Sequence, residues 1–349
     1  MPKPTHITCL CGDIFEPASI LPFEELPVEK HLCHCNICRY STGALCASYF
    51  ELKGEPSAKS LDRATAYHTP KYVRYFCKNC GCNVFAVGKT DDNNRWLACS
   101  GTLETDRKAA DDVVVNVSKI TAHIYVGDAA DGGIAPFLST IRGQEVPCYE
   151  VEDVGTAMDK AQLSLLRKGP PPPPAEKVLE RGDTLNAACH CGAVRFQIKP
   201  PAYDEKSEGW YVPPDRTKYY ARLCCCRSCR LSIGFTMQPW AYVPPGQILT
   251  DDGQPVLFGP QHKETTQLGA LRYYQSSDAV LRGFCSTCGA TMLYQPFERP
   301  YIIDVSVGIL RSKHGNTMAR EWLDWDRTVV SKLAEAADDD LARAWMQNE

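Results

Sequence analysis

The sequence lacks any apolar run that approaches the about 20 residues of a membrane-spanning helix. Its first residues, Met1 to Cys9, lack the apolar core of a signal peptide. Neither sign of charge is in large excess, since 38 Lys and Arg residues face 42 Asp and Glu residues, for a formal net charge of −4. A general nucleic-acid binder would instead carry a basic face or a Lys/Arg-rich tail. We therefore expect a cytoplasmic protein with neither a membrane nor a nucleic acid as its partner.

Cysteine, in contrast, is abundant, with 19 residues in a chain of 349. A disulfide framework is the first explanation to weigh for so many thiols. The odd count, the missing export signal and the clustering into C-x-C and C-x-x-C pairs all argue against it. Such pairs place two thiols on one short turn, which suits a shared metal ion. The pattern therefore favours bound zinc over disulfide bonds.

The cysteines form three motifs whose order occurs twice. The motifs are C-x-C-G, a triplet with thiols at positions i, i+2 and i+5, and F-C-x-x-C-G. Their thiols are Cys9, Cys11, Cys33, Cys35, Cys38, Cys77 and Cys80 in the first half and Cys189, Cys191, Cys224, Cys226, Cys229, Cys285 and Cys288 in the second. The offset between the halves grows from 180 to 191 and 208 residues along the chain. We therefore expect insertions in the second half, forming surface loops at 200–220 and 244–267.

A run of five prolines, Pro170 to Pro174, separates the two halves. Consecutive prolines favour a stiff spacer that cannot join a sheet or a helix interior. The predicted organisation is a first domain over 1–168, a linker over 169–180 and a second domain over 181–349. The segments between the cysteines are rich in β-branched and aromatic residues, so we predict a mainly β fold in which each domain is followed by a short helix. The clearest predicted strands are 113–117, 123–126, 193–198 and 301–307, and the predicted helices are 153–166 and 330–345.

The early C-x-C pair and the late C-x-x-C pair of each half together supply four thiolates, which completes a tetrahedral zinc site. A glycine after the last cysteine of each pair allows the tight turn and the approach of backbone amides to the sulfurs. The two predicted sites are Cys9, Cys11, Cys77 and Cys80, and Cys189, Cys191, Cys285 and Cys288. We expect these closed sites to be structural, because such a site forms only in the folded chain.

The triplets remain, and each leaves a metal ion one ligand short. In one interpretation the fourth ligand comes from elsewhere, from His31, His34 or Cys46 in the first half and from Cys225 in the second. In the other interpretation the fourth position stays open for water or substrate, as in catalytic zinc sites. Three thiolates outweigh the two charges of the ion, so an open site of this kind suits the binding of an incoming sulfur.

The motif order C-x-C-G, C-H-C-x-x-C-R and F-C-x-x-C-G resembles that of the glutathione-dependent formaldehyde-activating enzyme family, which also includes centromere protein V. The similarity extends to residues 96–104 and 123–128 of the first half. The resemblance implies two tandem β-tent domains, each with a four-cysteine structural zinc and a three-cysteine catalytic zinc, hence up to two zinc ions per domain. It implies a carbon–sulfur lyase that uses glutathione as co-substrate and acts on its adduct with an aldehyde or another small electrophile.

Carried onto this chain, the resemblance makes Cys33, Cys35 and Cys38 the catalytic zinc ligands of the first half and Cys224, Cys226 and Cys229 their counterparts in the second. His34, which lies between two ligands, and Arg39 are added as candidate catalytic residues. Arg39 and Arg230, which each follow a triplet, are candidate anchors for the carboxylates of glutathione. The second half has Cys225 in place of His34, so a role for that imidazole is absent there. The competing hypothesis is a non-catalytic zinc scaffold for protein or chromatin contacts.

Overall fold

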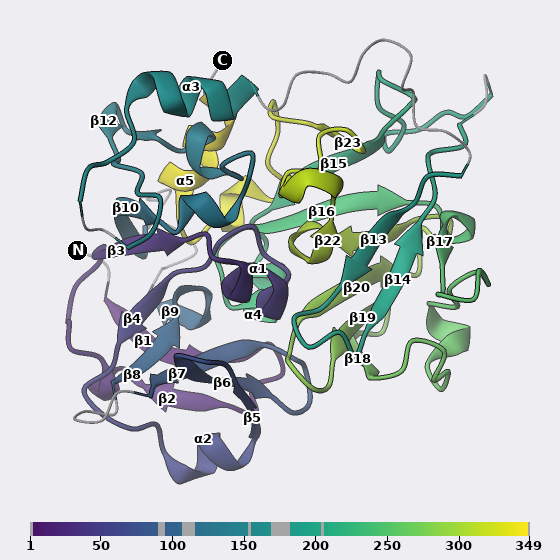
Figure 1. The fold of residues 1–349 in the computed structure, drawn as a ribbon. Helices are drawn as coiled ribbons and strands as arrows, with labels where there is room; N and C mark the ends of the chain where they lie inside the picture. Colours follow the sequence, from purple (N-terminus) through teal and green to yellow (C-terminus); the bar gives the residue numbers. More distant parts are fainter. Residues whose placement is uncertain are drawn as a thin grey trace.

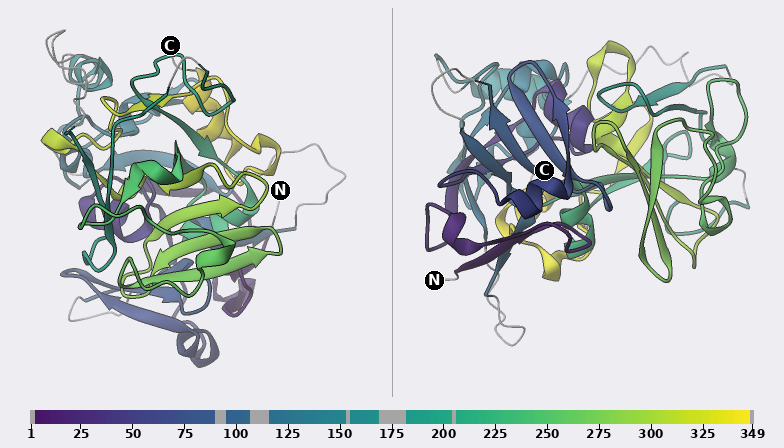
Figure 2. Two further views of the ribbon diagram at one scale, coloured as in Figure 1. Left: turned by 90° about the vertical axis from the view of Figure 1, so that its right-hand side faces the viewer. Right: turned by 90° about the horizontal axis from the view of Figure 1, so that it is seen from below.

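The computed structural model describes residues 3–89, 95–106, 116–152, 155–168, 182–203 and 206–347. Its two halves lie side by side, the first drawn in purple to teal and the second in green (Figure 1, Figure 2). Strands outnumber helices in both halves, which confirms the mainly β prediction. The proposed linker, 169–180, lies wholly outside the described residues. Within the described residues, no helix is both long enough and apolar enough to cross a membrane.

The first half is built on a five-stranded antiparallel sheet with strand order β4-β8-β7-β6-β5. A three-stranded sheet, β2-β1-β9, and a parallel pair, β3 and β10, complete this half, and β11 and β12 form a short hairpin. The strands are β1 (Pro4–Thr8), β2 (Phe15–Pro17), β3 (Val28–Cys33), β4 (Tyr49–Glu51), β5 (Ala64–His68), β6 (Tyr72–Cys77), β7 (Asn83–Gly88), β8 (Trp96–Cys99), β9 (Leu103–Thr105), β10 (Ser118–Ile124), β11 (Thr140–Ile141) and β12 (Gln144–Glu145).

The second half repeats this arrangement, with the central sheet extended to seven strands in the order β18-β19-β20-β21-β16-β15-β23. A four-stranded sheet, β17-β14-β13-β22, corresponds to the three-stranded sheet of the first half. The strands are β13 (Leu185–Ala188), β14 (Arg195–Ile198), β15 (Tyr219–Cys224), β16 (Gln238–Val243), β17 (Ile248–Leu249), β18 (Leu271–Ser277), β19 (Val280–Cys285), β20 (Thr291–Pro296), β21 (Ile303–Ser306), β22 (Leu310–Arg311) and β23 (Leu323–Trp325). Of the two predicted insertion loops, 244–267 contains β17 and so contributes to a sheet.

Two equivalent short helices, α1 (Asn36–Thr42) and α4 (Arg227–Ile233), begin inside the triplets. In each, the thiol of the middle cysteine caps the helix: Cys35 Sγ accepts from the Cys38 amide at 3.3 Å, and Cys226 Sγ accepts from the Cys229 amide at 3.4 Å. A sulfur thus does what an Asp or Ser oxygen usually does at a helix N-terminus. The remaining helices are α2 (Ala58–Asp62), α3 (Lys160–Lys168) and α5 (Asp339–Gln347).

Both helices predicted to follow the domains exist, but both begin later than predicted. Helix α3 begins at Lys160 because Asp159 forms a cap, in which its carboxylate accepts from the Gln162 amide at 2.8 Å. Helix α5 begins at Asp339, since Ser331 is held in an extended pairing with strand β15 through its amide and carbonyl groups, each at 2.9 Å. The predicted strand 113–117 lies mostly outside the described residues, and the strand predicted at 123–126 ends at Ile124.

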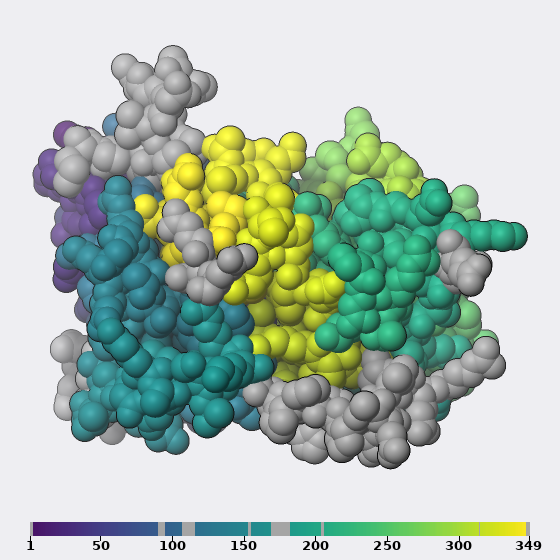
Figure 3. Space-filling view, turned by 90° about the horizontal axis from the view of Figure 1, so that it is seen from above, coloured from purple at the N-terminus to yellow at the C-terminus, as the bar shows by residue number. Residues whose placement is uncertain are grey.

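The two halves share one apolar core. Its largest buried cluster combines Leu32 and Leu45 of the first half with Phe235, Val307 and Ile309 of the second. The C-terminal segment, drawn in yellow, lies between the two halves (Figure 3). It contacts the first half through the Ser118 amide, which donates to Asp338 Oδ1 at 2.7 Å. The tail of the second half therefore helps to complete the first.

Candidate metal centres and their surroundings

Each half brings its C-x-C and C-x-x-C pairs together in one cluster of four thiols, as the sequence predicted. Cys9 and Cys11 follow strand β1, Cys77 is the last residue of β6, and Cys80 lies in the turn after it. The Cys11 sulfur lies 3.5 Å from both Cys9 Sγ and Cys77 Sγ. The second cluster repeats this geometry, with 3.5 Å between the sulfurs of Cys189 and Cys191 and 3.6 Å between those of Cys191 and Cys285. None of these cysteines forms a disulfide bond.

The spacing of these sulfurs fits a zinc ion. Four thiolates at about 2.3 Å from zinc in a tetrahedron are about 3.8 Å from one another. All sulfurs within each cluster lie within 4.8 Å of one another. Backbone amides also point at the sulfurs, since the amides of Ile14 and Val194 donate to Cys9 Sγ and Cys189 Sγ at 3.4 Å. Such hydrogen bonds favour the thiolate form that a metal requires.

Each triplet forms a separate cluster of three thiols at the junction of a strand and a helix. Cys33 ends strand β3, and Cys35 and Cys38 lie at the start of α1, with 3.6 Å between the sulfurs of Cys33 and Cys38. The second triplet takes the same positions at the end of β15 and the start of α4. In the described part of the chain, no fourth His, Cys, Asp or Glu joins either cluster of three.

None of the candidate fourth ligands expected from the sequence, His31, His34, Cys46 and Cys225, joins a cluster of three thiols. The imidazole of His34 is fully buried, and its Nε2 lies 2.9 Å from Nδ1 of His123, whose Nε2 in turn lies 3.1 Å from the Leu138 carbonyl. Burial lowers the pKa of His34 well below its ordinary value, so the ring is neutral. Cys46 and Cys225 are fully buried and belong to neither cluster. His34 therefore makes a structural hydrogen bond between the segment that joins β3 to α1 and the strand β10.

Two residues that the sequence analysis missed contact the first triplet. Arg74 donates from Nη2 to Cys38 Sγ at 3.2 Å, and the Tyr49 hydroxyl lies 3.6 Å from the same sulfur. Arg74 also donates to the Tyr49 hydroxyl at 2.6 Å. Hydrogen bonds from Cys33 and Cys35 lower the pKa of Cys38 well below its ordinary value, and the Arg74 cation adds to this effect. The sequence did hold a signal, because Arg74 and Arg282 share the 208-residue offset of the C-x-x-C pairs.

A pocket of about 420 Å³ opens beside the first triplet. Its wall is formed by strand β3, strand β4 and the segment that enters β8. The residues that line it include Lys30, His31, Cys33, Tyr49, Phe50 and Arg95. Cys33 and Tyr49 are only partly buried. Through Cys33, the first triplet therefore borders a space that is large enough for part of a small ligand.

The surroundings of the second triplet differ. Aromatic side chains pack around Cys224 and Cys229, among them Trp240 and Tyr242. Trp210, which comes from the inserted loop 200–220, lies with its ring 4.7 Å from that of Tyr242. The position of Tyr49 is taken by Trp240, which has no hydroxyl group to offer to a sulfur. The two triplets thus share their ligands but differ in the side chains around them.

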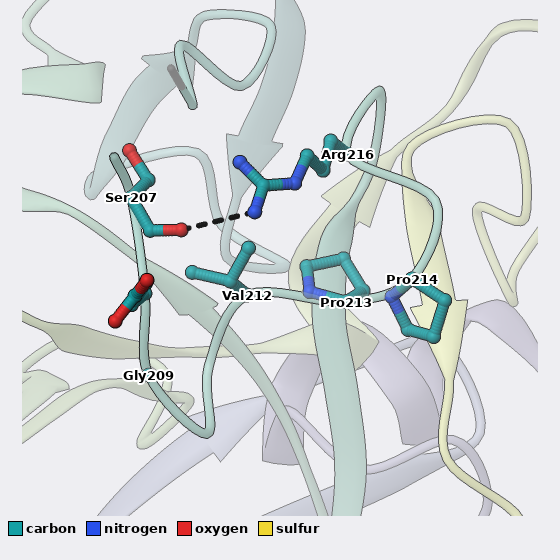
Figure 4. A pocket seen from close by; sticks show the side chains of 7 residues that line it. Ser207, Gly209, Val212, Pro213, Pro214 and Arg216 are labelled. Carbon is teal, nitrogen blue, oxygen red and sulfur yellow. Dashed lines mark hydrogen bonds between the residues drawn. The ribbon is translucent and has the colours of Figure 1, made fainter. Parts of the chain in front are cut away.

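A second pocket, of about 380 Å³, lies within the inserted loop 200–220 (Figure 4). Val212, Pro213 and Pro214 line it, and Arg216 donates to the Ser207 carbonyl at 3.2 Å. No thiol lines this pocket. It is therefore separate from the candidate metal centres.

The two arginines expected to anchor glutathione are both buried. Arg39 donates to Asn36 Oδ1 at 2.5 Å and to the Tyr40 hydroxyl at 3.2 Å. Arg230 donates to the carbonyls of Gly101 and Leu103 at 2.6 and 2.9 Å. Its second nitrogen pairs with Glu104 at 2.9 Å. Because the Arg230 guanidinium already binds the first half, the structure gives this residue a role in joining the halves, and neither arginine lines the pocket beside the first triplet.

Comparison with known proteins gives one informative match. A family model described as glutathione-dependent formaldehyde-activating enzyme matches residues 4–126 and 184–324, which together exceed half of the chain. No curated protein matches the chain. A crystal structure of a Rhodobacter sphaeroides protein is 21% identical and covers 40% of this chain and 99% of its own, with a TM-score of 0.25. The family match covers both halves and confirms the tandem repeat.

Proposed function

This chain belongs to the glutathione-dependent formaldehyde-activating enzyme family, and on that premise we propose that it is a zinc-dependent carbon–sulfur lyase. Its substrate would be the glutathione adduct of an aldehyde or another small electrophile. The observation that carries the proposal is the first triplet. Its three thiols have no fourth protein ligand among the described residues, and one of them, Cys33, lines a pocket. An open position next to a pocket is what a catalytic zinc site requires, whereas a structural site is closed.

The ligands of the proposed catalytic zinc are Cys33, Cys35 and Cys38. Zinc bound there would supply a mild Lewis acid that holds the sulfur of glutathione as a thiolate. Arg74 and Tyr49 hold the Cys38 sulfur in place through their contacts at 3.2 and 3.6 Å. The four-thiol clusters would be structural, because each is already complete with protein sulfurs.

The pocket is also lined by a cationic side chain, Arg95, that could bind a carboxylate of glutathione. Arg95 lines the pocket at its rim and pairs there with Glu51 at 2.8 Å. Both side chains are more than half exposed, at 63% and 51%, so exchange of Glu51 for a substrate carboxylate costs little. We therefore place a carboxylate of glutathione at Arg95, in place of Arg39 and Arg230, which do not line the pocket.

We further propose that the first triplet is the working site. Its pocket and the Tyr49 hydroxyl support this choice, and the second triplet has an aromatic residue, Trp240, at the corresponding position. The competing hypothesis, a non-catalytic scaffold, would require a closed coordination shell on both triplets, and no observation favours it.

Paired cysteine variants test the proposal. Turnover is measured with the zinc-loaded protein and preformed glutathione adducts of a panel of aldehydes. We expect Cys35→Ser to abolish turnover, whereas the matched variant Cys226→Ser, at the equivalent position of the second triplet, retains it. Metal analysis should show the loss of one zinc in each variant. Absence of turnover in the fully loaded wild-type protein across the panel would contradict the proposal, and full activity of Cys35→Ser would contradict the choice of site.

A further inference from the structure

A buried lysine lines the pocket beside the first triplet. Lys30 lies on strand β3 with only 5% of its surface exposed. Its Nζ donates to the Tyr49 carbonyl at 3.0 Å and lies 3.3 Å from the centre of the Phe50 ring. The same pocket is lined by Cys33. The amine is therefore held at a defined place in the wall of the pocket that Cys33 also lines.

The burial of this amine favours its neutral form. Burial lowers the pKa of Lys30 to about 6, and the charge of Asp338 offsets part of this effect. A lysine that is neutral near pH 7 has a free electron pair and can accept a proton. Lys119 on the adjacent strand β10 differs from Lys30, because its side chain is 56% exposed and pairs with Glu29 at 2.8 Å. Lys30 lines the pocket, whereas Lys119 does not.

We propose that Lys30 is the catalytic residue that moves the proton in the reaction of the first site. In the cleavage direction, Nζ takes the hydroxyl proton of the S-hydroxyalkyl adduct, and the electron pair of that O–H bond forms the carbonyl of the aldehyde. The carbon–sulfur bond breaks, and its electron pair leaves with the glutathione sulfur as a thiolate. In the reverse direction, the ammonium group returns the proton to the carbonyl oxygen as the thiolate attacks. This inference rests on the proposed lyase function and adds the group that the cysteine ligands do not supply.

The second half lacks this residue. Strands β3 and β15 both end at the first cysteine of a triplet, Cys33 and Cys224, and three residues earlier stand Lys30 and Ala221. A methyl group cannot exchange a proton. The proton-transfer step is therefore confined to the first half, which gives an independent reason why only one of the two triplets would turn over.

Several charged or titratable groups line the same pocket as Lys30 or act on its charge. His31 and Glu29 flank it on β3, Tyr49 and Glu51 lie on β4, Arg95 precedes β8, and Asp338 belongs to the C-terminal segment. Histidine is the side chain whose ordinary titration falls closest to that expected for Lys30. A test must therefore separate Lys30 from His31.

The test measures kcat/KM from pH 5 to 9 for four variants of the zinc-loaded full-length protein. A base must be deprotonated, so we expect kcat/KM of the wild type to rise through about pH 6 in the cleavage direction. Lys30→Met and Lys30→Arg should lower kcat/KM about 100-fold or more and abolish this rise. His31→Gln should keep the rise, and Lys119→Met should match the wild type. Circular dichroism and zinc content of the Lys30 variants would show that they are folded and loaded.

Two results would overturn the inference while the lyase function stands. One is a Lys30→Met variant with kcat/KM within about twofold of the wild type and an unchanged pH profile, and the other is loss of the rise in His31→Gln. A readout without turnover is competitive acetylation of the native protein at a series of pH values, followed by mass spectrometry. Reactivity of Lys30 that rises near pH 6, well before that of Lys119, supports the inference, and reactivity that rises only together with Lys119 contradicts it. Failure of the wild type to turn over any adduct would instead contradict the proposed function.

Discussion

Arginine residues near the triplets show how one residue type serves different purposes in this protein. Arg74 contacts a triplet sulfur, whereas Arg39 and Arg230, which follow the triplets in sequence, are buried in contacts of their own. Adjacency in sequence suggested that Arg230 would face a ligand. Its partners are Gly101, Leu103 and Glu104, more than 120 residues away, and no pattern in a single sequence reveals contacts at that separation. Lys30 was missed for another reason: it looks like an ordinary strand residue, and its contacts with Tyr49 and Phe50 arise only when two strands pack together.

Substitution of Arg230 separates a role in joining the halves from a role in binding glutathione. Arg230→Met leaves the carbonyls of Gly101 and Leu103 buried without their charged donor, so we expect the free energy of unfolding to fall by about 2 to 4 kcal/mol. Arg227→Met is the matched control, because Arg227 is 55% exposed and also pairs with Glu104, and it should cost less than about 1 kcal/mol. Denaturant unfolding measures both values.

The KM for the glutathione adduct distinguishes the two roles of Arg230. We expect the KM of folded Arg230→Met to stay within about twofold of the wild type, because the guanidinium does not line the pocket. An unchanged stability together with a large increase in KM would show that the anchor role expected from the sequence was correct.

At the scale of elements, the turns and the helix N-termini position the thiols and the contacts between the halves more directly than the strands between them do. Each triplet is preorganised by a strand end and by a seven-residue helix that a thiol caps. The two halves then meet where the backbone after each of these helices approaches the other half. The Gly308 amide donates to the Gly43 carbonyl at 2.9 Å, and the Gly101 amide donates to the Gly234 carbonyl at the same distance. Contacts this close exclude a side chain.

A methyl group at one of these contacts should therefore destabilise the protein. A Cβ atom at Gly101 would lie 2.3 Å from the Phe235 amide nitrogen, and backbone cannot rotate out of the way. We expect Gly101→Ala to lower the free energy of unfolding by about 1 to 3 kcal/mol. Gly54→Ala is the control, because a Cβ there meets nothing within 4 Å, and it should change stability by about 0.5 kcal/mol or less. Equal stabilities of the two variants would contradict this view of the interface.

For the whole molecule, the sequence predicted the repeat and the composition of all four thiol clusters. It could do so because the short spacing between cysteines on a tight turn already brings their sulfurs close together. It did not predict how the two halves differ. The pocket beside the first triplet and the aromatic side chains beside the second depend on residues from several strands and an inserted loop. Nor did it predict that the C-terminal segment lies between the halves (Figure 3). Asp338 of this segment accepts a hydrogen bond from the Ser118 amide of the first half. These features arise from packing between distant segments, which a motif order does not encode.

The central claim is that the open position of the first triplet accepts the sulfur of glutathione. The most direct measurement is the absorption spectrum of cobalt-substituted Cys226→Ser protein during titration with glutathione, since this variant leaves the first triplet as the only three-cysteine site. We predict that the sulfur-to-cobalt charge-transfer absorption increases to saturation, because a fourth thiolate joins the ion, and that Cys35→Ser shows no such increase. A spectrum that stays unchanged up to saturating glutathione, with cobalt confirmed at the first triplet, would contradict the account.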